Sequence, residues 1–160
     1  MKNTIAFRAD RLIWSLLLPF AAGGIGSVFT FTEIPTWYAA LTKPVWNPPN
    51  WLFGPVWTIL YLLMGISLYR YWQRASKERV GAGVGLMVGQ LVLNALWSIV
   101  FFGLHQPAGA VYVILVLWLA IVWTMVEFSR VDKVAAWLLA PYLAWVTFAS
   151  ALNYAVAILN

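Results

Sequence analysis

Four long runs without a charged residue limit what this chain can fold into. They extend over Leu12–Thr32, Pro44–Tyr69, Val80–Val126 and Val134–Asn160, and together they hold 121 of the 160 residues. A helix needs about 20 apolar residues to cross a bilayer. The runs are continuously apolar rather than alternating, which argues against membrane-spanning strands. The pattern excludes a soluble globular domain, a disordered chain and a nucleic-acid-binding protein, and it predicts an all-α integral membrane protein.

The run Val80–Val126 has 47 residues, about twice what one span needs. Glycine, histidine, glutamine and proline interrupt it at residues 103–107, where a turn is expected. The chain is therefore predicted to be a single domain, residues 1–160, formed by a bundle of five transmembrane helices. The predicted spans are Leu12–Thr32, Trp51–Trp72, Val80–Phe102, Ala108–Phe128 and Val134–Leu159.

The first run has a second interpretation, which is a cleaved signal peptide. Basic residues precede Leu12–Phe20, and Ala21–Gly23 has the small side chains of a cleavage site. The apolar stretch continues to Phe31, however, which is longer than a signal peptide needs. A retained span is therefore the expected outcome.

Lysine and arginine are distributed unevenly between the two ends of the predicted spans. Nine of the ten fall at the end that carries the N-terminus, and Lys43 alone falls at the other. The nine are Lys2, Arg8, Arg11, Arg70, Arg74, Lys77, Arg79, Arg130 and Lys133. Because basic loops tend to stay in the cytoplasm, the N-terminus is predicted to be cytoplasmic and the C-terminus outside. The net charge of +5 is then explained by the orientation of the chain in the membrane rather than by nucleic-acid binding.

The longest connection on the outer side, Glu33–Asn50, is too long for a tight turn. It combines prolines with large aromatic residues, which are Pro35, Pro44, Pro48, Pro49, Trp37, Tyr38 and Trp46. Such a segment fits an aromatic belt at the membrane surface. It also fits a lid over a cavity.

Tryptophan is unusually frequent, with 11 in 160 residues. Trp14, Trp37, Trp51, Trp72 and Trp137 lie near predicted span ends and suit anchoring at the interface. A second group lies deeper and consists of Trp57, Trp97, Trp118, Trp123 and Trp145. A buried indole N–H needs a hydrogen-bond partner. The deep group therefore predicts either a pocket with flat aromatic walls or close packing alone.

Two predicted helices each carry polar and aromatic residues on one face. The third span has Asn94, Trp97, Ser98 and Phe101, and the fifth has Tyr142, Trp145, Ala149 and Asn153. Their helical spacing places each set on one side of its helix. Both sets are expected in the outer half of the membrane, where they would form a pocket or simply hydrogen-bond between helices.

Gly81, Gly85 and Gly89 form two overlapping GxxxG steps in the third span. Glycines four apart let two helix backbones approach closely. A rotation of about 100° per residue places them nearly opposite the Asn94 face. They predict a homodimer interface or, alternatively, a packing face for another span of the same chain.

No catalytic or metal-binding constellation is recognisable. His105 is the single histidine, cysteine is absent, and Glu33 and Glu127 fall at span ends. An ion-coupled transporter would need a carboxylate at mid-membrane facing a cavity. The sequence therefore predicts no metal site, no resident cofactor and no hydrolytic or acid–base catalysis.

The segment Lys43–Trp57 closely resembles the proline- and tryptophan-rich signature of the tryptophan-rich sensory protein / translocator protein family (TspO/MBR). Three further blocks are similar to this family: Thr36–Tyr38, Asn94–Ser98 with Phe101–Gly103, and Pro141–Trp145 with Ala149. The resemblance covers nearly the whole chain. It implies a five-helix bundle in a prokaryotic cell membrane, often dimeric, with a pocket closed by the first long loop.

The resemblance implies a membrane receptor or sensor that binds porphyrins such as protoporphyrin IX, as ligand and not as cofactor. The implied pocket residues are Tyr38, Trp46, Pro48, Trp57, Asn94, Trp97, Ser98, Trp145 and Ala149. The alternatives are transport of porphyrin or sterol, or light- and oxygen-dependent breakdown of porphyrin with Trp57 and Trp145 as the redox-active side chains. Animal members carry a cholesterol motif that ends in a basic residue. No basic residue follows Tyr154 here, which favours porphyrin over sterol.

Overall fold

The computed structural model describes residues 8–160, so Lys2 of the predicted basic end lies outside the described part. Helices account for the regular structure of these residues, without strands. Five helical segments are long and apolar enough to cross a membrane, which confirms the predicted fold class. They are α1 (Ala9–Thr30), α3 (Asn50–Arg74), α4 (Lys77–Ser98) with the π-helix η1 (Ile99–Gly103), α5 (Pro107–Ser129), and α6 (Lys133–Trp137) with α7 (Ala140–Leu159). The short helix α2 (Trp37–Ala40) lies in the long loop.

The helix ends follow local chemistry. Pro107 begins α5, where the missing N–H of proline costs no helical hydrogen bond. Asp132 caps α6 because its side chain accepts from the backbone N–H of Val134 at 2.9 Å. Both α1 and α4 begin three residues before their predicted spans, and each has an acidic residue, Asp10 or Glu78, in its first turn. A negative charge there is favourable toward the helix dipole.

The fifth predicted span is divided into two helices. The chain leaves α6 after Trp137 and starts again at Ala140. Pro141 lies in the first turn of α7, and it has no N–H to donate to the carbonyl four residues earlier, at Trp137, where α6 ends. The proline therefore explains a break that a hydropathy pattern cannot detect.

The π-helix η1 widens the last turn of the third span. Phe101 and Phe102 are both buried in it, at 3% and 8% exposure, and their ring centroids are 4.8 Å apart. An α-helix would direct two consecutive side chains about 100° apart. The wider turn thus presents two phenylalanines to the end of the bundle that carries the long loop, where the sequence predicted only Phe101.

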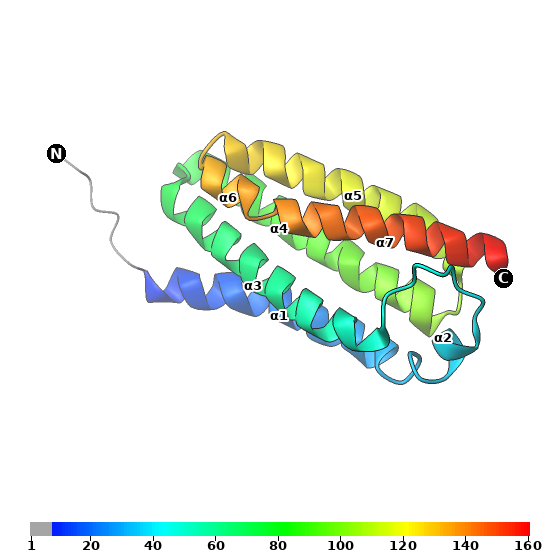
Figure 1. Ribbon diagram of the computed structural model, residues 1–160. Helices are drawn as coiled ribbons and strands as arrows, with labels where there is room; N and C mark the ends of the chain where they lie inside the picture. Colours follow the sequence, from blue (N-terminus) through cyan, green and yellow to red (C-terminus); the bar gives the residue numbers. More distant parts are fainter. Residues whose placement is uncertain (1–7) are drawn as a thin grey trace.

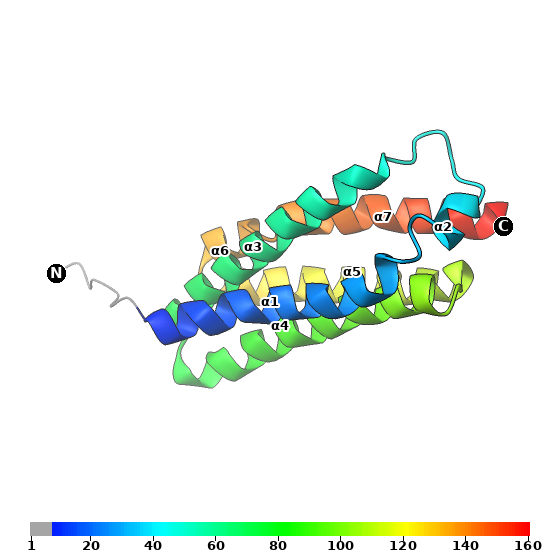
Figure 2. The same ribbon diagram turned by 90° about the horizontal axis from the view of Figure 1, so that it is seen from below.

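The spans form a closed arrangement in which α1 packs against α3 and α4, α4 against α5, and α5 against α7, while α6 reaches α3 (Figures 1 and 2). The closest approach of α1 and α3 depends on Gly65, since a Cβ there would lie 3.0 Å from the backbone of Leu16 and Ser15. The loop with α2 and the C-terminus lie at one end of the bundle, and α1 begins at the other.

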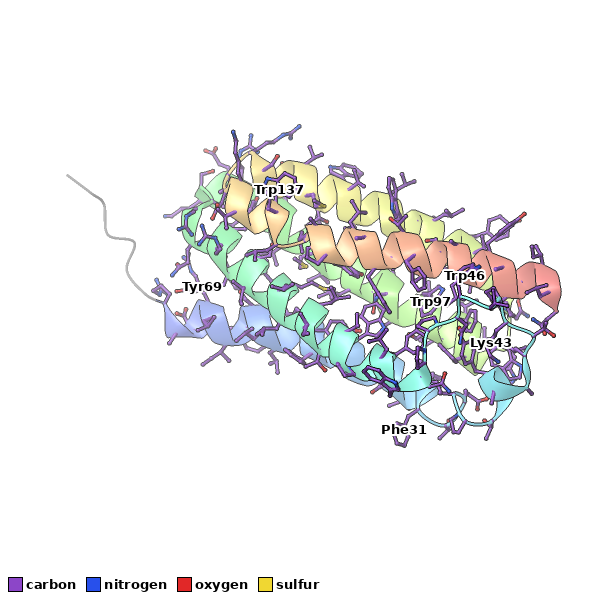
Figure 3. The ribbon with its side chains drawn as sticks, viewed as in Figure 1. Phe31, Lys43, Trp46, Tyr69, Trp97 and Trp137 are labelled. Carbon is purple, nitrogen blue, oxygen red and sulfur yellow. The ribbon has the colours of Figure 1, made fainter. Side chains whose placement is uncertain are left out.

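Ion pairs gather at the end where α1 begins. Asp132 pairs with Arg70 and Arg74, and Glu127 pairs with Arg79 and Arg130, at 2.9–3.3 Å. Lys43 lies at the opposite end with Trp46, whereas Tyr69 and Trp137 mark the charged end (Figure 3). The described basic residues are therefore segregated as predicted, and the cytoplasmic location of that end stays a prediction.

Candidate ligand-binding site

Asn94 lies at the centre of a hydrogen-bonded group that joins three spans. Its side chain is 3% exposed. The Oδ1 atom accepts a hydrogen bond from Tyr61 of α3 at 3.1 Å, and the Nδ2 atom donates to Tyr142 of α7 at 3.3 Å. Buried polar groups in a membrane bundle need such partners. The two faces predicted on α4 and α7 therefore meet at this point.

Trp97 is a second link between α4 and α7. Its Nε1 donates to Oδ1 of Asn153 at 2.9 Å, and Nδ2 of Asn153 donates to the carbonyl of Pro107 at 2.7 Å. The indole stacks on Phe101 with centroids 5.3 Å apart. Because its N–H is already used, Trp97 can offer a ligand its ring but not its hydrogen-bond donor.

Trp57 and Trp145 differ from Trp97, because neither indole N–H has an acceptor within residues 8–160. The ring of Trp57 stacks on Tyr61 at 5.3 Å and meets Tyr142 edge-on at 6.2 Å. The ring of Trp145 meets Phe53 edge-on at 6.0 Å. These two half-buried side chains combine flat apolar faces with unused donors, which suits a planar ligand that carries acceptors.

Ser98 and Ala149 contribute packing contacts, unlike the other predicted site residues, which make hydrogen bonds or aromatic ring contacts. The Oγ atom of Ser98 lies 3.1 Å from where a Cβ on Gly26 would be, so Ser98 packs at the contact of α4 with α1. Ala149 is partly buried against the main core cluster. Ser98 therefore faces α1 rather than the α3–α7 side, and Ala149 contributes a small apolar surface.

The loop residues Tyr38, Trp46 and Pro48 all lie at the end of the bundle opposite the arginine ion pairs. Tyr38 is buried, and its hydroxyl donates to Oδ1 of Asn47 at 2.6 Å. Burial raises the pKa of Tyr38 to about 12, so the hydroxyl stays a donor at neutral pH. Trp46 meets Phe148 of α7 edge-on at 5.7 Å, and the carbonyl of Pro48 accepts from Asn47 at 3.1 Å.

Polar contacts anchor this loop along its length. Lys43 donates through Nζ to three carbonyls of residues 38–41 at 2.6–3.2 Å. The side chain of Asn160 makes two hydrogen bonds of 3.0 Å with the backbone of Thr42. His105 lies 2.9 Å from the carboxylate of Glu33, and its ring stacks on Trp37 at 4.3 Å. The loop thus closes over this end of the bundle, which favours a lid over a surface belt.

Sequence reasoning missed several aromatic members of this site. Phe53 and Tyr61 lie four residues before and after Trp57 and share its face of α3, so helical spacing from Trp57 could have found them. Phe148 contacts both Trp46 and Trp145. It is adjacent to Ala149 in the chain, and only the packing of the loop on α7 singles it out.

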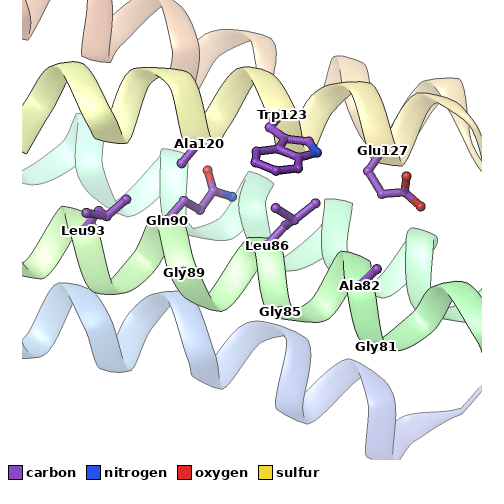
Figure 4. A pocket seen from close by; sticks show the side chains of 10 residues that line it. All are labelled: Gly81, Ala82, Gly85, Leu86, Gly89, Gln90, Leu93, Ala120, Trp123 and Glu127. Carbon is purple, nitrogen blue, oxygen red and sulfur yellow. The ribbon is translucent and has the colours of Figure 1, made fainter.

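Two open grooves lie on the sides of the bundle. One, of about 470 Å³, runs between α3 and α7 and is lined by Val56, Ile59, Leu60, Pro141, Ala144, Trp145 and Phe148. The other, of about 560 Å³, runs between α4 and α5 and includes Gly81, Gly85, Gly89, Gln90 and Trp123 (Figure 4). A Cβ placed at any of these three glycines would meet no atom within 4 Å. The glycines therefore do not pack against another span of the described chain.

Acid–base groups and metal ligands do not gather at the site. Within residues 8–160 no three histidine or carboxylate side chains lie close enough to hold a metal ion. The carboxylates of Glu127, Asp132 and Glu33 are paired with arginine or histidine side chains at the ends of the bundle. What the site offers is aromatic surface with a few donors, and such surfaces bind flat apolar molecules.

Comparison with known proteins agrees with this geometry. The TspO/MBR family pattern matches residues 15–159. The tryptophan-rich protein TspO of Archaeoglobus fulgidus is 47% identical over 152 residues, which cover 94% of this chain and 97% of the relative. The human translocator protein is 42% identical over 142 residues (88% and 84%), and the tryptophan-rich sensory protein of Cereibacter sphaeroides is 39% identical over 149 residues (92% of each). The chain is therefore a multi-pass membrane protein that belongs to the TspO/MBR family.

Proposed function

We propose that this protein is a membrane receptor or sensor for tetrapyrroles of the protoporphyrin IX type. A receptor or sensor role agrees with its family and with relatives named as sensory and translocator proteins. The observation that supports a tetrapyrrole as the ligand is that the indole N–H groups of Trp57 and Trp145 have no acceptor among residues 8–160. Both belong to aromatic walls beside the Asn94 group.

In this proposal the macrocycle lies against the rings of Trp57, Trp97 and Trp145. Aromatic stacking accounts for most of the affinity, and the free indole donors bind acceptor atoms at the edge of the ligand. Asn94 already bonds Tyr61 and Tyr142, so it holds the walls in place and has one N–H left for a ligand.

Titration with protoporphyrin IX, followed by quenching of intrinsic tryptophan fluorescence, tests the proposal. Trp145→Phe should raise the Kd about fivefold, the equivalent of one hydrogen bond of about 1 kcal/mol. Trp137→Phe is the matched control because Trp137 is 72% exposed at the charged end, and it should leave the Kd unchanged. Equal effects of both variants would indicate unspecific partition into detergent and would refute the site. A new product that forms only with protein and light would instead assign porphyrin breakdown.

We also infer that two copies associate through the groove of Figure 4. The glycine stripe is exposed, and a rotation of about 100° per residue places it on the side of α4 opposite the buried Asn94. The side chain of Gln90 lines the same groove, and its Oε1 is buried without a hydrogen-bond partner among the described residues. A second helix in the groove would gain close backbone contact and would supply neighbours for this amide.

A further inference from the structure

The contact between α3 and α7 differs from its neighbours in having no polar link in its outer part. From Asn50 to Gly65 the structure gives α3 no hydrogen bond to α7. The two helices meet there through ring edges, Phe53 with Trp145 and Trp57 with Tyr142, at centroid distances of 6.0 and 6.2 Å. By contrast, Trp118 donates to Thr147 between α5 and α7, and Ser67 donates to Ala135 between α3 and α6. Edge contacts of this kind can part by side-chain rotation alone.

The groove of about 470 Å³ lies over this contact. Ile59, at 57% exposure, forms part of its outer rim. Ile59 lies nine residues after Asn50, the first residue of α3, and is therefore roughly 14 Å from that helix end. This distance places Ile59 within the hydrocarbon core, which is about 30 Å thick. Trp145 lines the groove and also belongs to the aromatic site. The groove is thus continuous from the lipid-facing surface to a side chain that the ligand is proposed to contact.

The outer route, under the lid, is closed by polar contacts instead. A ligand that enters there must separate Asn160 from Thr42 and His105 from Glu33. It must also displace Trp46 from Phe148. Each of these hydrogen bonds is lost when the lid lifts, whereas the α3–α7 contact has none to lose.

We propose that the tetrapyrrole reaches the aromatic site sideways from the bilayer, between α3 and α7 and past Trp145, while the lid stays closed. This route rests on the proposed function, because it supplies the same site. A flat apolar macrocycle is concentrated in the membrane, and the groove lining is apolar throughout except for the indole of Trp145. The free N–H of Trp145 is then the first donor that an incoming ligand meets.

The chain has no cysteine, so a single engineered thiol can block the route after the protein has folded. Ala144→Cys places the thiol in the groove, and Ala151→Cys places it at another exposed position of α7 as the matched control. Each purified variant is labelled with a bulky aromatic maleimide and reconstituted into nanodiscs. Association and dissociation of protoporphyrin IX are then followed by stopped-flow tryptophan quenching. A third variant, Thr42→Cys/Asn160→Cys, cross-links the lid to the end of α7.

Labelling at position 144 should slow association and dissociation about tenfold with an unchanged Kd, because a blocked route alters rates and not the bound state. The label at position 151 and the cross-linked lid should leave both rates within about twofold of the unmodified protein. The route is overturned if the cross-linked lid stops binding while the label at 144 does not slow it. A label at 144 that weakens the Kd without slowing association would also overturn it, since the groove would then be the site itself. If unlabelled protein does not bind protoporphyrin at all, the proposed function fails rather than the route.

Discussion

At the scale of single residues, the partner of each indole N–H separates the deep tryptophans into groups that the sequence could not distinguish. Trp97 and Trp118 donate to Asn153 and Thr147 at 2.9 and 2.8 Å, so their N–H groups hold helices together. Trp57 and Trp145 have no such acceptor within residues 8–160. Trp123 is 66% exposed on the side of α5. The first group stabilises the bundle, and the second is available to a ligand.

The Asn94 group gives a prediction at this scale. Asn94→Ala removes both hydrogen bonds and leaves the hydroxyls of the buried Tyr142 and the partly buried Tyr61 without these partners, so it should lower the free energy of unfolding by about 1–3 kcal/mol. Tyr142→Phe removes one of the two bonds and should cost about 0.5–1.5 kcal/mol. Equilibrium unfolding in mixed detergent micelles measures both values. A Tyr142→Phe variant that is less stable than Asn94→Ala would show that Asn94 is not the centre of the group.

At the scale of helices, α4 has two faces with opposite uses. The side of α4 that carries Gly83 and Asn94 is buried within the bundle. The opposite side carries Gly81, Gly85 and Gly89, which line an open groove. Glycine also has an internal use at Gly65, where α1 and α3 come too close for a side chain. Glycine therefore serves close packing at Gly65, whereas Gly81, Gly85 and Gly89 leave an open surface.

The matched pair Gly85→Leu and Gly65→Leu tests this difference. Gly85→Leu should fold, shift the protein from dimer to monomer, and keep protoporphyrin binding, because its side chain enters open space opposite the site. Gly65→Leu should destabilise the bundle by about 3 kcal/mol or more, because the side chain meets the backbone of α1. Native mass spectrometry and thermal unfolding report the two effects. A Gly85→Leu protein that stays dimeric would refute the proposed interface, and one that loses binding would show that the two faces are not independent.

At the scale of the whole molecule, charge marks one end and aromatic residues close the other. Two acidic residues, Glu127 and Asp132, pair with four arginines at the end where α1 begins. The lid at the opposite end holds a single basic side chain, Lys43, whose charge is satisfied by backbone carbonyls. This asymmetry is the physical basis for predicting that the charged end is cytoplasmic.

Cysteine labelling tests this orientation without interference from native thiols. Val45→Cys, at a fully exposed position of the lid, should react with a membrane-impermeant maleimide in intact spheroplasts. Lys77→Cys, at the first residue of α4, should react only after the membrane is opened. Reaction of the thiol at position 77 in sealed spheroplasts would reverse the predicted topology.

The sequence by itself determined the five spans, the long loop after the first span, the separation of charge and the two faces of α4. These features depend on local hydropathy and on helical periodicity, which are properties of neighbouring residues. It could not determine the break before Pro141 or the π-helix at Ile99–Gly103, because both are departures from regular helical geometry. Only the tertiary structure decided that Asn94 bonds Tyr61 and Tyr142, that Ser98 faces α1, and that α3 and α7 meet without a polar link. These contacts join side chains tens of residues apart, and they depend on which helices become neighbours when the bundle closes.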